Sequence, residues 1–523
     1  MYVTVKQRRF FYVCTVLPLY HHKLIHIFAM NTSHHQSSLL KMLWITALLM
    51  ILMMASAPVP GSNANATAAP KADTPAPRYI FLFIGDGMGP AHLKLGELLL
   101  PEKQTLAISS FPVIGMATTH ASDRLITDSA AAGTALATGS KTTVGTISMA
   151  GNHLDTLRTI AEMAKARGMR TGIVSSVGID DATPACFYAH NAKRGNLYDI
   201  AIQMTTSGFN YFGGGYAEGN LPANLAKAKV PQGDLDALMR SAGYVITGNR
   251  EELHAVKPGM RCWAHTGHDS RAAMRHAMDR HADELELSDF TREGIRLLDN
   301  PRGFFMMVEG GKIDWAAHAN DAAAVAGDVI AFDKAVQEAV AFYHRHPRQT
   351  LIIVTADHEC GGLSLGNTAN GYEIRPNLLR YQKISRQQLG EKVTAWKQHR
   401  TAVTFPMALD SLKSWYRLGD VTADAALALS DRDSINIKSA WNAVFAPEQT
   451  QRNGKESTEP FTAVTTGLLN TKAGIGWSST AHTAIPVQVF AIGQGAEAFG
   501  GQYDNTDIAK KIIRLARLKT TAP

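Results

Sequence analysis

Three uninterrupted apolar runs, each of strand length, end close to an acidic side chain. They span residues 79–84, 304–308 and 351–354, and the acids that follow are Asp86, Glu309 and Asp357. An apolar run without alternation is typical of a strand buried on both faces, as in a parallel sheet. Ligands of open parallel α/β sheets bind beyond the carboxyl ends of the strands. We therefore expect a parallel sheet with three acids along one edge.

Patterns typical of helices separate these strands. Apolar residues recur at helical spacing in 155–167, 321–343 and 506–518, and further strand-like runs occupy 171–175 and 485–492. Such alternation is characteristic of a parallel sheet with helices on both faces. The predicted fold is α/β, a three-layer sandwich with a mostly parallel central sheet.

One long segment, 366–474, interrupts the alternation. It combines short polar helical patterns with Trp396, Trp415 and Trp441 and has little strand character. We interpret it as an insertion between two core strands, and as an interface element, because tryptophan is a common anchor of interfaces. The alternative is a self-contained subdomain whose tryptophans fill its own small core.

The first 66 residues do not belong to the predicted core. Lys41 precedes an apolar stretch, 42–54, that is short for a transmembrane helix and is followed by small residues, as in a secretory signal. Ala64-Asn65-Ala66 offers a cleavage site of the small-x-small type. A translation start at Met30 would give this signal an ordinary layout, which makes the preceding residues a spurious extension.

The rest of the chain divides into a short Ala- and Pro-rich tether, 67–78, and one large domain, 79–523, that contains the insertion. The signal predicts a periplasmic or secreted protein without stable membrane association after cleavage. An uncleaved membrane anchor is the alternative.

The charge balance and the cysteine content of the mature chain give no support to nucleic acid binding or to a disulfide framework. Residues 1–66 carry five of the 52 bases and no acid, so 47 bases and 45 acids remain in the mature chain. This near balance gives no reason to expect nucleic acid binding. The mature chain holds Cys186, Cys262 and Cys360, an odd number that cannot all pair internally and that includes no CxxC unit, so the sequence gives no basis for a disulfide prediction.

Two pairs of acid and imidazole indicate a metal centre. Asp314 and His318 are four residues apart, so on a helix they share one face and can bind the same ion. Asp357 and His358 follow a predicted strand and form a second pair. Two clustered cations can bind the attacking and the leaving oxygen of a phosphoryl group.

Ser129 stands at the start of an Ala-rich helical pattern, 129–138. A helix amino terminus offers free backbone N–H groups and a positive dipole end, which suit a phosphate. An ordinary serine cap is the alternative. A phosphate-binding loop of the GxxxxGK[ST] type is excluded, because Gly139-Ser140-Lys141-Thr142 lacks the required order.

Taken together, these residues resemble the alkaline phosphatase family across the large domain outside the insertion. Seven motifs occur in the family's order: Gly85-Asp86-Gly87-Met88-Gly89, Thr127-Asp128-Ser129-Ala130, Asp181-Ala182-Thr183-Pro184, His190 to Arg194, Glu309 with Asp314 and His318, Thr355-Ala356-Asp357-His358, and His482-Thr483. The resemblance implies hydrolysis of phosphate monoesters to an alcohol and inorganic phosphate. It also implies a homodimer with the insertion as a crown at the interface.

The resemblance implies a role for each residue. It gives two zinc sites, formed by Asp314, His318 and His482 and by Asp86, Asp357 and His358. Asp86 would also join Thr183 and Glu309 around one magnesium ion, because oxygen ligands suit Mg²⁺ whereas imidazoles suit Zn²⁺. Ser129 resembles the nucleophile that becomes a phosphoserine, and Arg194 resembles the guanidinium that binds two phosphate oxygens.

The chain departs from some members of the family at Asp181, an acidic variant, and at Trp315, where others carry Lys or His. Three alternatives remain open. A sulfatase is disfavoured because Ser129 lacks the required C/S-x-P-x-R context. A phosphodiesterase of the same superfamily usually carries Thr as nucleophile and lacks the third metal set. A periplasmic metal- or phosphate-binding protein would not need the nucleophile.

Overall fold

The computed structural model describes residues 75–228, 232–266, 272–398, 403–445 and 459–520. The signal and residues 67–74 of the tether therefore lie outside the described residues. Among those described, no helix combines the length and the apolar character needed to cross a membrane.

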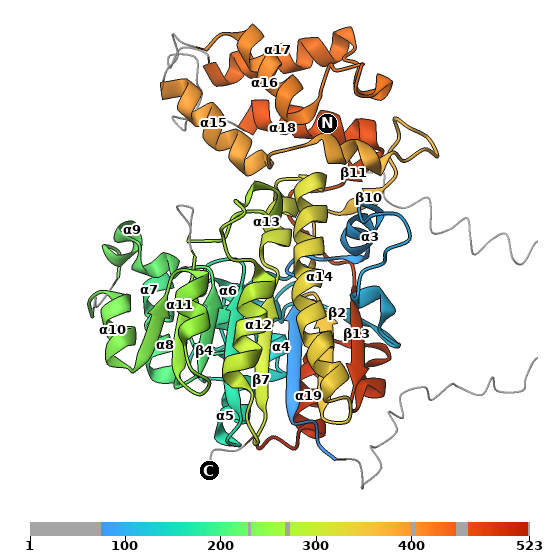
Figure 1. Ribbon diagram of the computed structural model, residues 1–523. Helices are drawn as coiled ribbons and strands as arrows, with labels where there is room; N and C mark the ends of the chain where they lie inside the picture. Colours follow the sequence, from blue (N-terminus) through green and yellow to red (C-terminus); the bar gives the residue numbers. More distant parts are fainter. Residues whose placement is uncertain (1–74, 229–231, 267–271, 399–402, 446–458, 521–523) are drawn as a thin grey trace, which may run out of the picture. The chain divides into compact units, whose positions relative to one another are not determined.

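A ten-stranded sheet forms the centre of the domain (Figure 1). Its spatial order is β14-β2-β13-β8-β1-β7-β3-β4-β6-β5. The strands are β1 (Tyr79–Ile84), β2 (Val113–Thr118), β3 (Arg170–Ser175), β4 (Tyr211–Gly214), β5 (Tyr244–Thr247), β6 (Arg261–His265), β7 (Phe304–Glu309), β8 (Thr350–Thr355), β13 (Val487–Gly493) and β14 (Gly501–Asp504). Every pair is parallel except those that β13 makes with β2 and β8. The predicted mostly parallel α/β sheet is confirmed.

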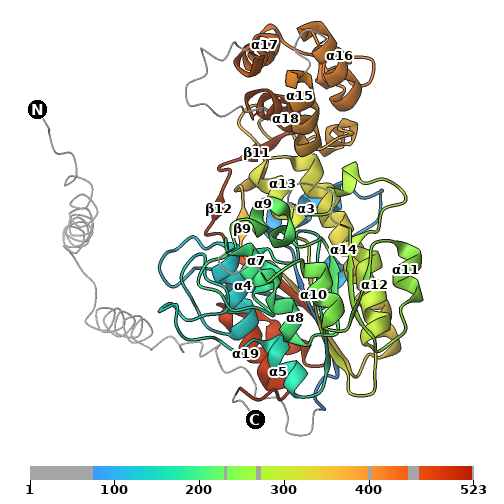
Figure 2. The ribbon, with the colours of Figure 1, turned by 90° about the vertical axis from the view of Figure 1, so that its left-hand side faces the viewer.

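Helices cover both faces of the sheet. Figure 2 shows α12 (Leu287–Leu298) and α14 (Ala322–Arg345) on one face, and α4 (Ser129–Thr138), α5 (Ile160–Ala166) and α19 (Thr506–Leu515) on the other. The predicted helix over 155–167 begins later, at Ile160. Thr159 and Glu162 form a capping box there, and Gly168, at φ 87°, follows its end.

Shorter elements connect these layers. They are α3 (Pro90–Leu98), η1 (Ile108–Ser110), α6 (Ala182–Ala185), α7 (Leu197–Ala201), α8 (Gln203–Ser207), η2 (Glu218–Asn220), α9 (Pro222–Leu225), α10 (Leu235–Ser241), α11 (Arg250–Ala255), η3 (Ala277–Asp279), α13 (Lys312–His318) and η7 (Ala496–Phe499).

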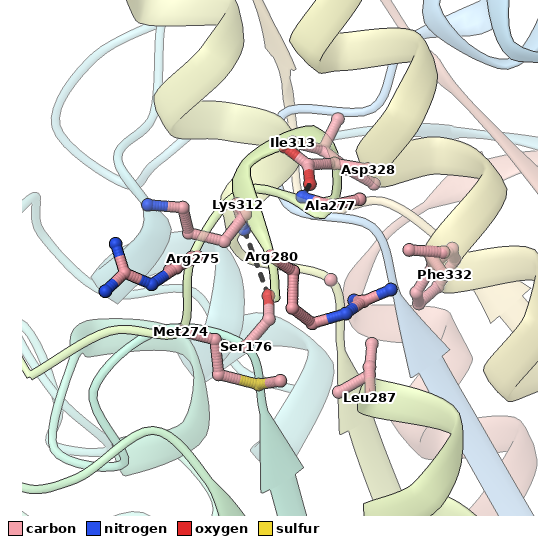
Figure 3. Close-up of a pocket in the computed structure, with 12 residues that line it drawn as sticks. Ser176, Met274, Arg275, Ala277, Arg280, Leu287, Lys312, Ile313, Asp328 and Phe332 are labelled. Atoms are coloured by element: carbon pink, nitrogen blue, oxygen red, sulfur yellow. Dashed lines mark hydrogen bonds between the residues drawn. The ribbon is translucent and has the colours of Figure 1, made fainter. Parts of the chain in front are cut away.

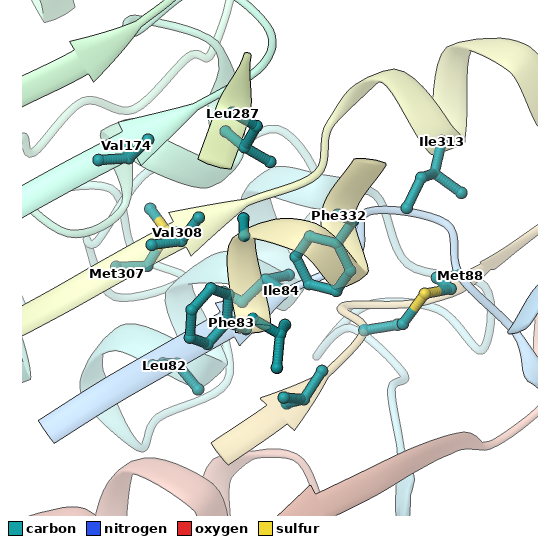
Figure 4. Packing of buried hydrophobic residues seen from close by; sticks show 14 of the residues in the cluster. Leu82, Phe83, Ile84, Met88, Val174, Leu287, Met307, Val308, Ile313 and Phe332 are labelled. Carbon is teal, nitrogen blue, oxygen red and sulfur yellow. The ribbon is translucent and has the colours of Figure 1, made fainter. Parts of the chain in front are cut away.

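Strand β1 lies within the core, and its six residues are all buried. Its neighbours β7 and β8 are buried throughout as well, and Ile84 of β1 is level with Glu309 of β7 and with Thr355 of β8. Phe83 meets Phe332 of α14 edge to face at 5.9 Å between ring centroids (Figure 4). The three strands therefore end at the same height, which brings their acids to one edge.

The segment 366–474 is helical. It contains η4 (Pro376–Tyr381), α15 (Arg386–Gln398), α16 (Phe405–Tyr416), η5 (Ala425–Leu427), α17 (Asp431–Phe445) and α18 (Glu459–Ala473). Two short antiparallel pairs flank it: β9 (Glu359–Cys360) with β12 (His482–Thr483), and β10 (Leu363–Leu365) with β11 (Ile475–Trp477).

The tryptophans of this segment contact one another. Trp396 stacks on Trp415 at 5.8 Å between centroids and lies 6.1 Å from Trp441, which in turn meets Phe461 edge to face. Trp441 is buried. The expectation that these side chains are anchors of an interface is wrong for Trp441, because its ring fills the small core of the insertion. That packing matches the alternative of a self-contained subdomain.

Candidate active site

The residues of the first predicted zinc set, called the first metal group below, come from two segments far apart in the sequence. Helix α13 presents Asp314 and His318 on one face, with Oδ2 of Asp314 3.3 Å from Nε2 of His318. His482 arrives from β12, and its Nε2 lies 3.1 Å from Nε2 of His318 and 3.6 Å from Oδ1 of Asp314. The i, i+4 spacing read from the sequence therefore produces one cluster of ligand atoms.

Hydrogen bonds determine which ring nitrogen each histidine offers. Nδ1 of His318 donates to the carbonyl oxygen of Thr480 at 2.7 Å, and Nδ1 of His482 donates to that of Thr127 at 2.9 Å. Each ring therefore directs an Nε2 lone pair toward the other and toward Asp314. Facing lone pairs repel unless a cation or a proton lies between them, so this donor set fits a metal ion.

The residues of the second predicted zinc set, called the second metal group below, lie at the ends of β1 and β8. Nε2 of His358 lies 3.1 Å from Oδ2 of Asp357 and 3.4 Å from Oδ1 of Asp86. All three side chains are buried. Oδ1 of Asp86, Oδ2 of Asp357 and Nδ1 of His358 have no hydrogen-bond partner. Buried carboxylate oxygens without a partner are costly, and a cation would satisfy them.

The predicted magnesium set adjoins the second group through Asp86. Oγ1 of Thr183 donates to Oδ2 of Asp86 at 3.2 Å. Glu309 is fully buried at the end of β7, where Oγ of Ser175 donates to Oε2 and Oε1 remains without a partner. These atoms are hydroxyl and carboxylate oxygens, a donor set that suits a hard cation.

Electrostatics also favour cations here. Burial, and then the negative charges of Asp357 and Asp314, raise the pKa of Asp86 well above its usual range. Burial raises the pKa of Glu309 to about 8, against the hydrogen bond from Ser175, which lowers it. The hydrogen bond to Asp314 raises the pKa of His318 to about 9. A bound cation would replace these protons and keep the carboxylates ionised.

Ser129 begins helix α4, as the sequence predicts, and Asp128 is its N-cap. Oδ1 of Asp128 accepts a hydrogen bond from the backbone N–H of Ala131 at 3.0 Å. Oγ of Ser129 lies 3.3 Å from Nε2 of His358. The hydroxyl is therefore held at a positive helix end and within reach of the second metal group.

Two carboxylates hold Arg194. Its Nη1 donates to Oδ2 of Asp128 at 3.2 Å and its Nη2 donates to Oδ1 of Asp181 at 3.0 Å. Sequence reasoning identified Arg194 but missed the role of Asp128, although its position directly before Ser129 was a usable signal. The two pairs orient a planar guanidinium beside the serine, a geometry suited to binding two oxygens of a phosphate.

A separate pocket lies next to the end of β7. There the backbone N–H of Lys312 donates to Oγ of Ser176 at 3.1 Å (Figure 3). Lys312, Arg275 and Arg280 line it. Each of these cations has a partner: Gln387 for Lys312, Glu284 for Arg275 and Glu286 for Arg280. None of the predicted site residues lines this pocket, so it is distinct from the metal groups.

Sequence reasoning missed one member of the first group. Sγ of Cys360 lies with the ligand atoms of Asp314, His318 and His482, all within 4.8 Å of one another. The signal available was its position two residues after His358. Cys186, Cys262 and Cys360 are buried and free, so no disulfide joins them.

The sheet is mostly parallel, and one of its edges carries two acid–imidazole groups, a serine at a helix amino terminus and an arginine held by two carboxylates. These features together define a metal-dependent α/β enzyme. The alkaline phosphatase family model matches residues 77–518. The chain therefore belongs to the alkaline phosphatase family and is a phosphatase.

Individual relatives agree with this assignment. The chain is 30% identical over 464 residues to alkaline phosphatase 4 of Bacillus subtilis, covering 86% of this chain and 90% of that protein. It resembles the crystal structure of a cold-active alkaline phosphatase from a psychrophilic Shewanella, with 28% identity and a TM-score of 0.69 over 84% of this chain and 99% of that one. The Thermus thermophilus alkaline phosphatase, at 24% identity and a TM-score of 0.70 over 89% of this chain and 97% of that one, shares the fold. Family and fold together support hydrolysis of phosphate monoesters.

Proposed function

We propose that this chain hydrolyses phosphate monoesters to an alcohol and inorganic phosphate through a phosphoserine at Ser129, with two zinc ions and one magnesium ion bound. The observation that carries the proposal is the placement of Oγ of Ser129, 3.3 Å from Nε2 of His358, beside buried carboxylate oxygens that have no partner. Such oxygens would repel an anionic substrate unless cations neutralised them.

The proposed ligands follow the predicted sets. Asp314, His318 and His482 would hold one Zn²⁺; Asp86, Asp357 and His358 would hold the second; and Asp86, Thr183 and Glu309 would hold Mg²⁺. When bound, the ions would favour the ionised form of the serine hydroxyl and stabilise the charge of the leaving and attacking oxygens.

The protein's own groups perform the rest of the reaction. Arg194 would bind two oxygens of the substrate phosphate, oriented by Asp128 and Asp181. Oγ of Ser129, after releasing its proton to water, would form a bond to phosphorus as the bond from phosphorus to the substrate's ester oxygen breaks. That oxygen would take up a proton from water and leave as the alcohol. Water would then displace Ser129 from phosphorus, which releases inorganic phosphate and restores the hydroxyl.

Removal of metal tests this proposal. Protein treated with EDTA and dialysed should lose activity toward p-nitrophenyl phosphate and recover it when Zn²⁺ and Mg²⁺ are returned. Metal analysis of the active mature protein should find two zinc ions and one magnesium ion per chain. Full activity in metal-free protein would make the mechanism wrong.

The same assay separates the alternatives. A phosphodiesterase would prefer bis(p-nitrophenyl) phosphate, a sulfatase would prefer p-nitrophenyl sulfate, and a binding protein would turn over none of the three. We expect the monoester to be hydrolysed much faster than the other two, because Arg194 and the metal groups together suit a doubly charged terminal phosphate.

We further propose that the protein is exported to the periplasm or the medium and acts as a homodimer. The signal-like sequence 42–54 supports export, and the family resemblance supports the dimer. Cell fractionation tests the first proposal, and light scattering of the mature protein tests the second. Activity confined to the cytoplasm, or the mass of a single chain, would contradict them.

A further inference from the structure

A thiol lies among the potential ligand atoms of the first metal group. Sγ of Cys360 is one of four potential ligand atoms, with those of Asp314, His318 and His482, that all lie within 4.8 Å of one another. The side chain of Cys360 is fully buried and forms no disulfide. Among the described residues, the one hydrogen bond of its thiol runs from Sγ to the carbonyl oxygen of Asp314; it is 3.9 Å long and therefore weak.

Strand pairing places this thiol beside a histidine of the same group. In the antiparallel pair of β9 and β12, Cys360 is directly opposite His482. Residues directly opposite in such a pair project to the same face with their Cβ atoms about 5 Å apart. The thiol and the imidazole therefore approach the group from adjacent positions.

The loop after β1 closes the other side of Cys360. The backbone N–H of Cys360 donates to the carbonyl oxygen of Gly87, in this loop, at 3.1 Å. A Cβ added at Gly87, where φ is +69°, would lie 2.7 Å from Oδ1 of Asp314 and 2.9 Å from Cβ of Cys360. A side chain at position 87 would therefore clash with both Asp314 and Cys360. Asp314 is only 6% exposed, and its Oδ1 has no hydrogen-bond partner. A buried, unpartnered carboxylate oxygen next to a buried thiol points independently to a cation.

We infer that Cys360 is a fourth protein ligand of the metal ion that Asp314, His318 and His482 bind. The inference rests on the proposed function, because it concerns the same metal group. On binding, Sγ forms a bond to the ion and its proton is released to water. A thiolate is a soft ligand and favours Zn²⁺, Cd²⁺ or Co²⁺ over Mg²⁺ and Mn²⁺. The second group, Asp86, Asp357 and His358, contains no sulfur.

Cobalt substitution tests the inference with a readout other than activity. A thiolate bound to Co²⁺ gives a charge-transfer band in the near ultraviolet, whereas the visible d–d bands report cobalt binding by any ligands. We expect both sets of bands in the full chain loaded with Co²⁺. Visible bands without the near-ultraviolet band would overturn the inference and leave the proposed function intact. Failure to bind cobalt at all would overturn both.

Cysteine variants assign the sulfur. Cys360→Ser should lose the near-ultraviolet band and retain the visible bands, because three ligands of the group remain. Cys186→Ser and Cys262→Ser are matched controls, since both residues are buried free cysteines outside the described metal groups, and both variants should keep the band. Persistence of the band in Cys360→Ser would assign it to another cysteine and overturn the inference.

Metal preference gives an independent measurement. Cys360→Ser should weaken Cd²⁺ binding by more than the roughly 10- to 100-fold that loss of an outer hydrogen-bonded partner costs, and should weaken Mn²⁺ binding much less. Equal losses for the two ions would indicate a general disturbance of the site, and would overturn the assignment of Cys360 as a ligand.

Discussion

Arg386, the first residue of helix α15 in the insertion, donates a hydrogen bond of 2.5 Å from Nη1 to the carbonyl oxygen of Ala319, the residue after His318. Its backbone N–H also donates to Oδ2 of Asp321 at 2.6 Å, and Nε2 of Gln382 donates to Oδ1 of the same carboxylate at 2.8 Å. The insertion supplies none of the predicted ligands, yet it anchors the turn that follows a ligand helix. It is therefore coupled to the metal group through α13.

Replacing Arg386 should weaken metal binding at the first group. We expect Arg386→Ala to lower its Zn²⁺ affinity by on the order of tenfold, because loss of an outer partner loosens the ligands it positions. Competition with a chromogenic chelator would measure the change. Arg375→Ala is the control, since the only hydrogen bond or ion pair of the Arg375 side chain among the described residues is to the exposed Glu373. Unchanged affinity in a folded Arg386→Ala protein would show that the insertion does not position His318.

Replacing the nucleophile should abolish the covalent intermediate. Ser129→Ala should reduce the hydrolysis rate by on the order of 10² or more, because water would have to attack from a less favourable position. Incubation of the wild type with labelled phosphate, followed by acid trapping and peptide mapping, should place the label on Ser129. Label on a different residue would reassign the nucleophile.

The central strands were predictable because their physical signal is local. Burial on both faces keeps the runs 79–84, 304–308 and 351–354 of β1, β7 and β8 apolar, and the acids that follow these runs must lie at one edge once the strands are parallel. The spacing of Asp314 and His318 likewise needs only a helix to become a shared face.

Contacts between distant segments were not predictable in this way. Cys360 meets His482 through a pair of two-residue strands separated by the whole insertion, and no local pattern encodes that pairing. Trp441 was misinterpreted for a related reason. Helical periodicity shows which side of a helix is apolar but does not show whether another helix of the same chain covers it.

Replacing Arg194 should weaken phosphate binding while the metals stay bound. Arg194→Ala removes a bidentate, charge-assisted contact, so the inhibition constant for inorganic phosphate should rise by the equivalent of about 1.5–3 kcal/mol. Arg194→Lys should recover only part of this, because an ammonium cannot pair with Asp128 and Asp181 and also bind two phosphate oxygens. An unchanged inhibition constant in a fully metallated Arg194→Ala protein would remove the residue from the site.

The segment that carries Arg194 begins with a charged pair. Nδ1 of His190 contacts the carbonyl oxygen of Ser148 at 2.7 Å, and its Nε2 contacts Oε1 of Glu162 at 3.0 Å. Both partners are acceptors, so the ring satisfies both only when it carries two protons. Burial lowers the pKa of His190, but the hydrogen bonds to Glu162 and Ser148 raise it by more, and the result is a pKa above the ordinary 6.5.

This pair should make stability depend on pH. Because the pKa of His190 is higher in the folded state than in the unfolded state, its contribution is fully present below about pH 6.5 and is lost as the pH rises through the raised folded value. His190→Gln should therefore lower the free energy of unfolding by about 1 kcal/mol in mildly acidic solution, allowing for partial exposure of the pair, and by progressively less in alkaline solution. Urea unfolding of both proteins between about pH 5 and 9 would measure the difference, and this range avoids protonation of Glu162. A difference that stayed constant or grew with pH would show that His190 is neutral in the folded protein.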